Sequence, residues 1–274
     1  MLAILKREFK SYFQNIVGFL FVGALLATFG LYFYAYNLSS GYPYLSYSLS
    51  SISFILIIAV PILTMRCFSE ERKNKVDQLV LTAPVSVGKI VMGKYFAMAA
   101  VFAIDNVIFA VAPLILSRFG TVPFGECYVS LFGFFLYGCT LISIGMFISS
   151  ITESQVIAAV LSFAVFFIGY MMKSIEGLVS ANGNIVTKIM SAFDLYSPFD
   201  GFNSGCLDLT GTAYYVTVIV LFMFLTTQSI QKRRWSISSK KISTGVFSVT
   251  FVAVAMVVSV LFNMLVSSLP SSVT

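Results

Sequence analysis

The stretch 95-YFAMAAVFAIDNVIFAVAPLIL-116 decides the fold of this chain, and Asp105 is its single acidic or basic side chain. A bilayer core about 30 Å thick is crossed by about 20 residues of helix, at about 1.5 Å per residue. A barrel strand is about half as long and alternates apolar with polar residues, which this stretch does not do. The stretch therefore predicts a helix that crosses a membrane.

Other runs of the same kind lie on both sides of it. They cover residues 16–36, 49–65, 128–150, 155–172, 213–230 and 245–266. The chain of 274 residues is 58% hydrophobic and only 10% charged, whereas soluble domains carry about 25% charged residues. The sequence therefore predicts an all-α polytopic membrane protein without room for a sizeable soluble domain.

The basic residues gather at the ends of these runs, which is typical of membrane orientation rather than of nucleic-acid binding. If the N-terminus lies inside, 14 of the 17 lysines and arginines fall in cytoplasmic segments, and only Arg118, Lys173 and Lys188 fall outside. This bias predicts a cytoplasmic N-terminus and a cytoplasmic segment 66–94. It also predicts an external loop 173–212, with a short helix near 185–193.

The first residues, 1-MLAILKREFKSYFQN-15, place apolar and basic side chains on different helical faces. The apolar side chains are Leu2, Leu5, Phe9, Tyr12 and Phe13, and the basic ones are Lys6, Arg7 and Lys10. This pattern favours an amphipathic helix that lies in the membrane interface. A plain basic flank of the first span is the alternative.

The segment 69-SEERKNKVDQLVLTAPVS-86 concentrates charge between two apolar runs. Ser69 is a candidate N-cap, and the two acids behind it favour the positive end of a helix dipole. Pro84 ends that helix, and Ser86 is placed to cap the next one. An elbow of two helices results, projecting from the membrane, with an apolar ridge at 76–81 beside charges of both signs. Such a surface suits docking to a soluble partner, and a basic loop that only sets topology is the alternative.

The segment 69-SEERKNKVDQLVLTAPVSVGKIVMGKYFA-97 resembles the connection between the second and third spans of ABC-2 type permeases. It shares with them an acidic pair, a basic residue, a Leu-rich turn, Thr-Ala-Pro-Val-Ser and a Gly-Lys-Tyr that enters the next span. The segment 197-SPFDGFNSGCLDLTGTAYYVTVIVLFMFLTTQSIQKRRW-235 is similar to the end of the gliding-motility-associated, GldF-like subgroup. The matching positions are Asp200, Phe202, Asn203, Gly205, Asp208, Tyr214, Tyr215 and 232–235.

The resemblance implies a six-span permease core over residues 1–235, followed by an additional anchor at 236–274 that resembles the start of a GldG-like partner protein. Such a permease is the transmembrane half of an ATP-driven transporter in the bacterial inner membrane, here an exporter. It works with a cytoplasmic ATP-binding subunit and a second transmembrane half: the same chain, a sister permease or a GldG-like protein. The residues expected to couple to the ATPase are Glu70, Glu71, Arg72, Lys73, Leu79, Thr82 and Pro84.

Catalysis and cofactor binding are not expected in this chain. It contains no Walker A motif, so ATP is expected on the partner subunit. Histidine is absent and no C-x-x-C spacing occurs, which argues against a zinc or haem site. An intramembrane enzyme is disfavoured, because paired acids or a nucleophile with its base are missing. The remaining alternative is a non-transporting scaffold that docks an ATPase or motility or secretion machinery through the same elbow.

Asp105, followed by Asn106, is the polar candidate inside the membrane. An intramembrane carboxyl group is a candidate for a substrate path or a proton-linked function. The alternative is a packing group that is bonded to a neighbouring span.

Two features are expected near the external end of the spans. Phe33 and Tyr34 form an aromatic belt or a ligand platform together with Tyr42, Tyr44 and Tyr47. Cys127 and Cys206 both lie at or near the external side, so a disulfide between them is an option, although nothing in the sequence fixes their distance.

Overall fold

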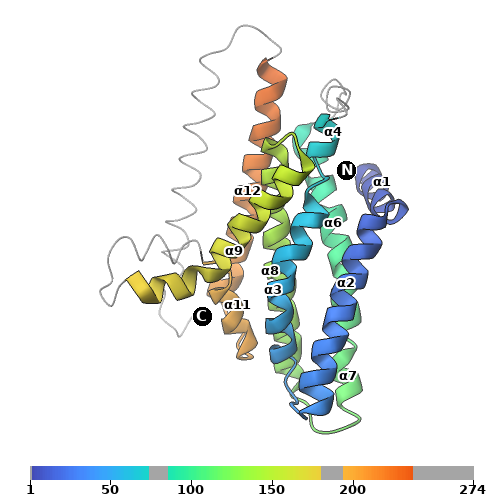
Figure 1. The fold of residues 1–274 in the computed structure, drawn as a ribbon, viewed down its shortest axis with the longest axis vertical. Helices are drawn as coiled ribbons and strands as arrows, with labels where there is room; N and C mark the ends of the chain where they lie inside the picture. The colour runs from blue at the N-terminus through green and yellow to red at the C-terminus, as the bar shows by residue number, and fades with distance from the viewer. Residues whose placement is uncertain (1, 74–85, 180–193, 237–274) are drawn as a thin grey trace.

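The computed structural model describes residues 2–73, 86–179 and 194–236, and every regular element within them is helical (Figure 1). The predicted all-α polytopic fold is confirmed, since six helical segments of the described chain are long and apolar enough to cross a membrane. They are Ile16–Ser39, Ser46–Arg72, Val87–Leu116, Phe124–Ile151, Gln155–Met172 and Leu209–Lys232. The seventh predicted run, 245–266, and the short helix predicted near 185–193 lie outside the described residues.

The N-terminal helix α1 (Leu2–Gln14) is separate from the first span. The backbone becomes extended at Asn15, and α2 (Ile16–Tyr32) then runs in a different direction (Figure 1). The first span continues as a π-helical segment, η1 (Phe33–Ser39), and a short turn leads into α3 (Ser46–Thr64). Because α1 packs against α6 as well as α2, it closes one end of the bundle.

The connection after α3 begins with a turn and the short helix α4 (Ser69–Lys73). The chain returns as α6 (Val87–Phe109), with Ser86 at its N-cap position but without a side-chain capping bond. Thus the helix predicted at 95–116 starts two turns earlier. It also breaks at its far end, where Pro113 sits in the first turn of α7 (Ala112–Leu116), as suits a residue without an N–H.

The central element is α8 (Phe124–Ile151), which packs against α3, α6, α9 (Gln155–Val179), α11 (Ser197–Asn203) and α12 (Leu209–Ser236). Small residues allow this close packing, as is usual between spans in a membrane. A Cβ atom at Gly138 would lie 2.2 Å from the Phe102 ring, and one at Gly145 would lie 2.5 Å from Thr64 Oγ1. The neighbouring helices therefore approach α8 where it has no side chain.

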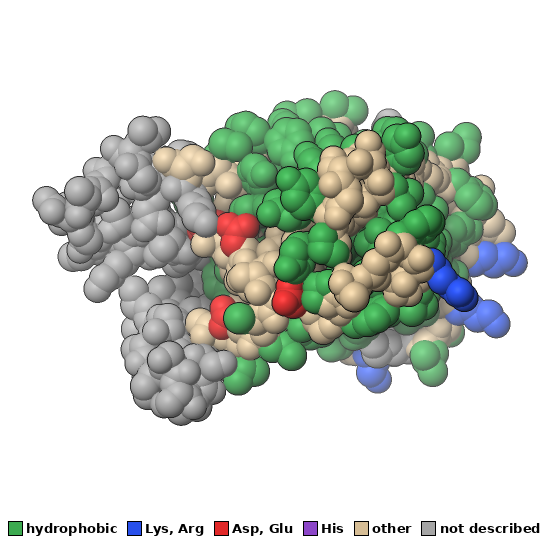
Figure 2. Space-filling view, turned by 90° about the horizontal axis from the view of Figure 1, so that it is seen from below, with side chains coloured by type: hydrophobic (Ala, Val, Ile, Leu, Met, Phe, Trp, Pro, Cys, Tyr) green, Lys and Arg blue, Asp and Glu red, His purple; other side chains and the backbone are tan. Residues whose placement is uncertain are grey.

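The outer surface of the described bundle is largely apolar. Figure 2 shows the end that is lowest in Figure 1, with hydrophobic side chains over most of the surface and a few Asp and Glu side chains between them. Beneath this surface α11 packs onto α8, with Phe199 and Phe202 fully buried. Large apolar side chains are also exposed along the spans, among them Leu31, Val107 and Val160, and such a perimeter matches a hydrocarbon solvent.

Candidate functional site

A buried cation, Lys94, lies at the end of the bundle where α1 and α4 meet. It sits about two turns into α6, and 3% of its side chain is exposed. Its Nζ atom lies 2.7 Å from Glu71 Oε1 of α4 and 3.4 Å from Glu8 Oε2 of α1. It also donates to the Cys67 carbonyl at 3.1 Å. Because a buried charge is stable only when it is paired, this Lys94 cluster (Lys94, Glu71, Glu8) joins three helices through one ammonium group.

A serine of the central helix holds the beginning of α4. Ser149 Oγ accepts the N–H groups of Phe68 at 3.2 Å and Ser69 at 3.3 Å, and it donates to the Met65 carbonyl at 3.3 Å. The first N–H groups of a helix need an acceptor from outside it. The prediction that Ser69 supplies this cap is wrong, because the Ser69 hydroxyl donates to the Met65 carbonyl and the cap comes from α8.

Glu70 and Arg72 of the described elbow also pair within the chain. Glu70 accepts two hydrogen bonds from Arg66, at 2.6 and 2.9 Å. Arg72 forms an ion pair with Glu153 and donates to the Ile151 carbonyl at 2.7 Å. In the described part of the predicted elbow, α4 lies against α8 and α9. Glu70, Glu71 and Arg72 of this helix each pair with a group on a neighbouring turn or helix.

The predicted coupling residues are therefore only partly brought together. Glu70, Glu71 and Arg72 lie on one short helix, and Lys73 is its last residue. Leu79, Thr82 and Pro84 lie outside the described residues. Their contacts with an ATPase stay predictions.

The amphipathic pattern of the first fifteen residues is present in α1. Lys6, Arg7 and Lys10 are exposed, whereas Phe9 and Tyr12 pack against the core. Arg7 also donates to Glu8 at 2.7 Å, and this carboxylate raises the pKa of the guanidinium above its usual range. Glu8, the acid that pairs with Lys94, therefore lies among the exposed basic residues of α1 in the sequence.

Asp105 and Asn106 lie on α6, about three turns from Lys94. Asp105 is fully buried, and neither of its carboxyl oxygens has a hydrogen-bond partner among the described residues. Asn106 donates to the Leu131 carbonyl of α8 at 3.4 Å. Of the two, Asn106 therefore matches the alternative of a group bonded to a neighbouring span, and Asp105 does not.

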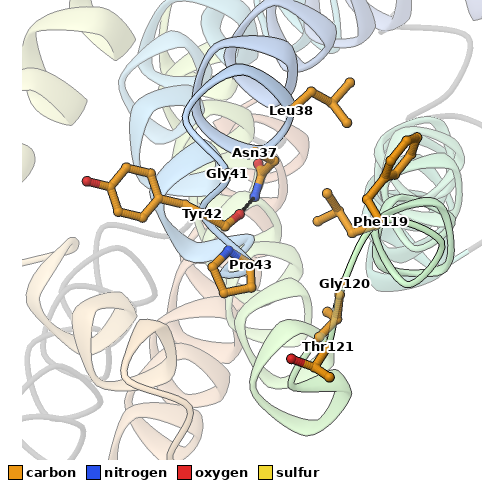
Figure 3. A pocket seen from close by; sticks show the side chains of 10 residues that line it. Asn37, Leu38, Gly41, Tyr42, Pro43, Phe119, Gly120 and Thr121 are labelled. Carbon is orange, nitrogen blue, oxygen red and sulfur yellow. Dashed lines mark hydrogen bonds between the residues drawn. The ribbon is translucent and has the colours of Figure 1, made fainter.

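A pocket of about 490 Å³ opens at the opposite end of the bundle (Figure 3). Its lining consists of Asn37, Leu38, Gly41, Tyr42, Pro43, Leu116, Phe119, Gly120, Thr121 and Val122. Asn37 fixes the turn beside it by donating to the carbonyls of Tyr42 at 2.8 Å and Tyr44 at 3.1 Å, and by accepting from Ser48 at 2.7 Å. The pocket lining carries no charge, so it offers nothing to pair with an ionic ligand.

The structure also describes the tyrosines and cysteines that were expected near this end. Tyr42, Tyr44 and Tyr47 are all exposed, an arrangement typical of an aromatic belt at a membrane interface. Cys127 is buried and Cys206 exposed, and both are free. Within the described ranges, no three Cys, Asp or Glu side chains gather as metal ligands would.

The geometry thus comprises a six-span bundle with a short charged helix tied to one end of it. Comparison with known families identifies the type of protein. The model for ABC-2 family transporter proteins matches residues 10–230. The chain belongs to this family. No curated protein matches it significantly.

Membership gives the chain its general role. It is a membrane permease subunit of an ABC transporter, the component that acts with an ATP-binding subunit and is not itself catalytic. The matched region covers the first five described spans and nearly all of the sixth. Lys94, Glu71, Ser149 and Asp105 therefore all lie in the family domain, whereas Glu8 lies two residues before it.

Sequence reasoning missed two members of the Lys94 cluster as site residues, Lys94 itself and Glu8. Lys94 stands near the start of an apolar run, where a lysine indicates membrane orientation. The helical spacing of apolar residues could have indicated that Lys94 is buried. Ile90 and Met98 lie four residues before and after Lys94, on the same face of the helix, and both are buried. A lysine on the apolar face of a helix needs an acid to pair with.

Proposed function

We propose that this permease belongs to an exporter and that its α4 segment receives the movement of a separate cytoplasmic ATP-binding subunit. The observation that carries the proposal is the Lys94 cluster. A displacement of α4 acts directly on Lys94, because Glu71 and the Cys67 carbonyl both bind its ammonium group. Since Lys94 belongs to a helix of the membrane domain, force applied at α4 reaches the spans without an intervening flexible joint.

The same cluster supports a role for α1 beside the docking site. Glu8 lies 3.4 Å from the same ammonium group, so α1 is coupled to any movement that reaches α6. This arrangement agrees with an N-terminal helix in the cytoplasmic interface, with its basic residues toward anionic lipid headgroups. A cytoplasmic N-terminus in a bacterial inner membrane is part of this proposal.

The proposal also covers the subgroup of the permease and the assembly of the transporter. The similarity of residues 197–235 to GldF-like permeases supports a gliding-motility-associated type of transporter. The second transmembrane half is then another copy of this chain, a sister permease or a GldG-like protein.

The test must separate docking from internal stability, because the elbow charges pair within the chain. The Arg66–Glu70 pair suits this purpose, since both side chains are partly exposed and lie four residues apart on the chain. Exchanging them (Arg66→Glu with Glu70→Arg) keeps an ion pair but reverses its direction. We expect an unchanged melting temperature and a loss of affinity for the ATP-binding subunit of at least about tenfold, or about 1.4 kcal/mol.

The readouts are co-purification with the ATP-binding subunit encoded beside this chain, and ATP turnover in liposomes. Lys89→Met serves as a control, because Lys89 is an exposed cation on α6. Full affinity and full turnover in the exchanged variant would exclude docking through this pair. If the wild-type complex assembles but no lipid, peptide or drug is transported or stimulates turnover, the non-transporting scaffold is the better description.

A further inference from the structure

The carboxyl group of Asp105 is enclosed in the bundle, and no residue that the structure describes bonds to it. Its exposed fraction is 0%, and neither oxygen forms a hydrogen bond with the described residues. An ionised carboxylate in such surroundings is strongly unfavourable, because it has lost water and gained nothing in exchange. No described side chain neutralises this group.

Aromatic rings enclose Asp105 along its own helical face. Phe102 lies three residues before it and Phe109 four residues after it, so all three side chains share this face. The Phe102 ring packs against Phe21 of α2 and Phe134 of α8, with ring centroids 6.4 and 5.7 Å apart. Phe109 stacks on Phe29 of α2 at 4.0 Å. The acid thus lies on the face that α2 and α8 cover.

The packing decides which cation this site accepts. The Phe102 ring lies so close to Gly138 that a Cβ atom there would be only 2.2 Å away. Phe102, Phe109 and Phe134 are all fully buried. A metal ion or an ammonium group needs a cavity and several ligand atoms, whereas a proton needs neither.

The ionisable groups of the surrounding helices leave the acid without a counter-charge. Along α2, α8 and α12, the buried stretches contain only tyrosines and cysteines among ionisable residues. They are Tyr32 of α2, Cys127, Tyr128, Tyr137 and Cys139 of α8, and Tyr214 and Tyr215 of α12. The charged residues of the helices that contact α6 are far along the bundle from the acid or near helix ends. They are Lys6, Arg7, Glu8 and Lys10 of α1, which lies at the Lys94 end of the bundle, Glu126 near the start of α8, and Lys232, Arg233 and Arg234 near the end of α12. On α6 itself, Lys94 is committed to Glu71 and Glu8.

We propose that Asp105 is a proton-binding site, which holds its proton while Phe102 packs on Gly138 and releases it to water when this packing opens. The site depends on the contact between α6 and α8. Because Lys94 and Asp105 are eleven residues apart, about three full turns, they lie on the same side of α6. A movement of α6 that starts at the Lys94 cluster would then change the proton occupancy of Asp105.

The test is infrared spectroscopy of the purified full chain in lipid nanodiscs. An aspartic acid in water ionises near pH 3.9, so a protonated carboxyl band at neutral pH identifies an enclosed acid. We expect this band in the wild-type protein, its loss in Asp105→Asn, and its retention in Glu126→Gln, which removes an exposed carboxylate of α8. Absence of the band in the wild-type protein, or its persistence in Asp105→Asn, would overturn the proposal.

Release is tested by forcing the contact open. Gly138→Ala places a methyl group against the Phe102 ring, and Phe102→Ala removes the ring, so one of the two serves if the other does not fold. In either variant the pH at which the band is half lost should fall toward the value of a hydrated aspartic acid. A midpoint equal to that of the wild-type protein in a folded variant would show that release does not depend on this contact. Neither measurement involves the ATP-binding subunit, so the two tests remain valid even if the proposed transport function fails its own test.

Discussion

Removing the charge of Lys94 gives a direct measure of how strongly α1, α4 and α6 are joined. Lys94→Met keeps most of the side-chain volume but leaves Glu71 and Glu8 without their shared cation. Breaking a buried ion pair from one side costs about 3–5 kcal/mol. The two acids are 21% and 16% exposed, so water hydrates part of each. We therefore expect a loss of about 2–3 kcal/mol in the free energy of unfolding, below the fully buried case.

The distances in the cluster predict an order among the single variants. Glu71 lies 2.7 Å from the ammonium group and Glu8 lies 3.4 Å from it. Glu71→Gln should therefore cost more than Glu8→Gln. The double variant Lys94→Met with Glu71→Gln should cost less than the sum of its parts by about 1–2 kcal/mol, because both partners of the pair are then absent.

The assay is reversible unfolding in mixed micelles, followed by the far-ultraviolet circular dichroism of the helices. Lys89→Met is the matched control, since this exposed cation of the same helix should change stability by less than about 0.5 kcal/mol. If Lys94→Met unfolds at the same denaturant concentration as the control, the ion pairs contribute nothing and α6 is not joined to α4 through them. An equal cost for Glu8→Gln and Glu71→Gln would refute the distance argument.

Four further variants test the packing and polar contacts of the bundle. Ser149→Ala leaves two N–H groups of the α4 connection without an acceptor and should cost about 1–3 kcal/mol in the same unfolding assay. Gly145→Ala forces a Cβ atom to within 2.5 Å of Thr64 Oγ1 and should cost about 1–3 kcal/mol. Gly30→Ala, where nothing lies within 4 Å, should be neutral or slightly stabilising. Arg72→Met breaks an ion pair whose acid is 72% exposed, so the loss should be at most about 1 kcal/mol and should shrink in added salt.

The spans of this chain were predictable from the sequence because the membrane imposes a strong local rule. About 20 apolar residues in succession are needed to cross it, and each predicted run in the described ranges coincides with a helix. Asp105 was found as a candidate by the same rule, since an acid inside an apolar run stands out. Its lack of a partner was not predictable, because that depends on which faces of α2 and α8 turn toward it.

The end of the bundle that carries α4 was less predictable. Charge near the end of a span has two uses, orientation and pairing, and a sequence does not distinguish them. Lys94, Glu71 and Glu8 come from three separate helices, and only the packing of α1 against α6 brings them together. The Ser149 cap illustrates the same difficulty, because an acceptor eighty residues along the chain replaced the local one.

The central position of α8 has a consequence for how sequence change is distributed over this permease. In the apolar 18-residue stretch of α8, 72% of the residues are buried, against 22% in the corresponding stretches of the spans that contain α2, α9 and α12. A library of single substitutions should therefore be depleted along α8, most sharply where bulk replaces glycine. On the outward faces of α2 and α9, exchange of one large apolar residue for another should be accepted freely. Substitutions that adapt the protein to bilayers of different thickness, or to a different second transmembrane subunit, are therefore expected on the peripheral helices, whereas α8 should change little.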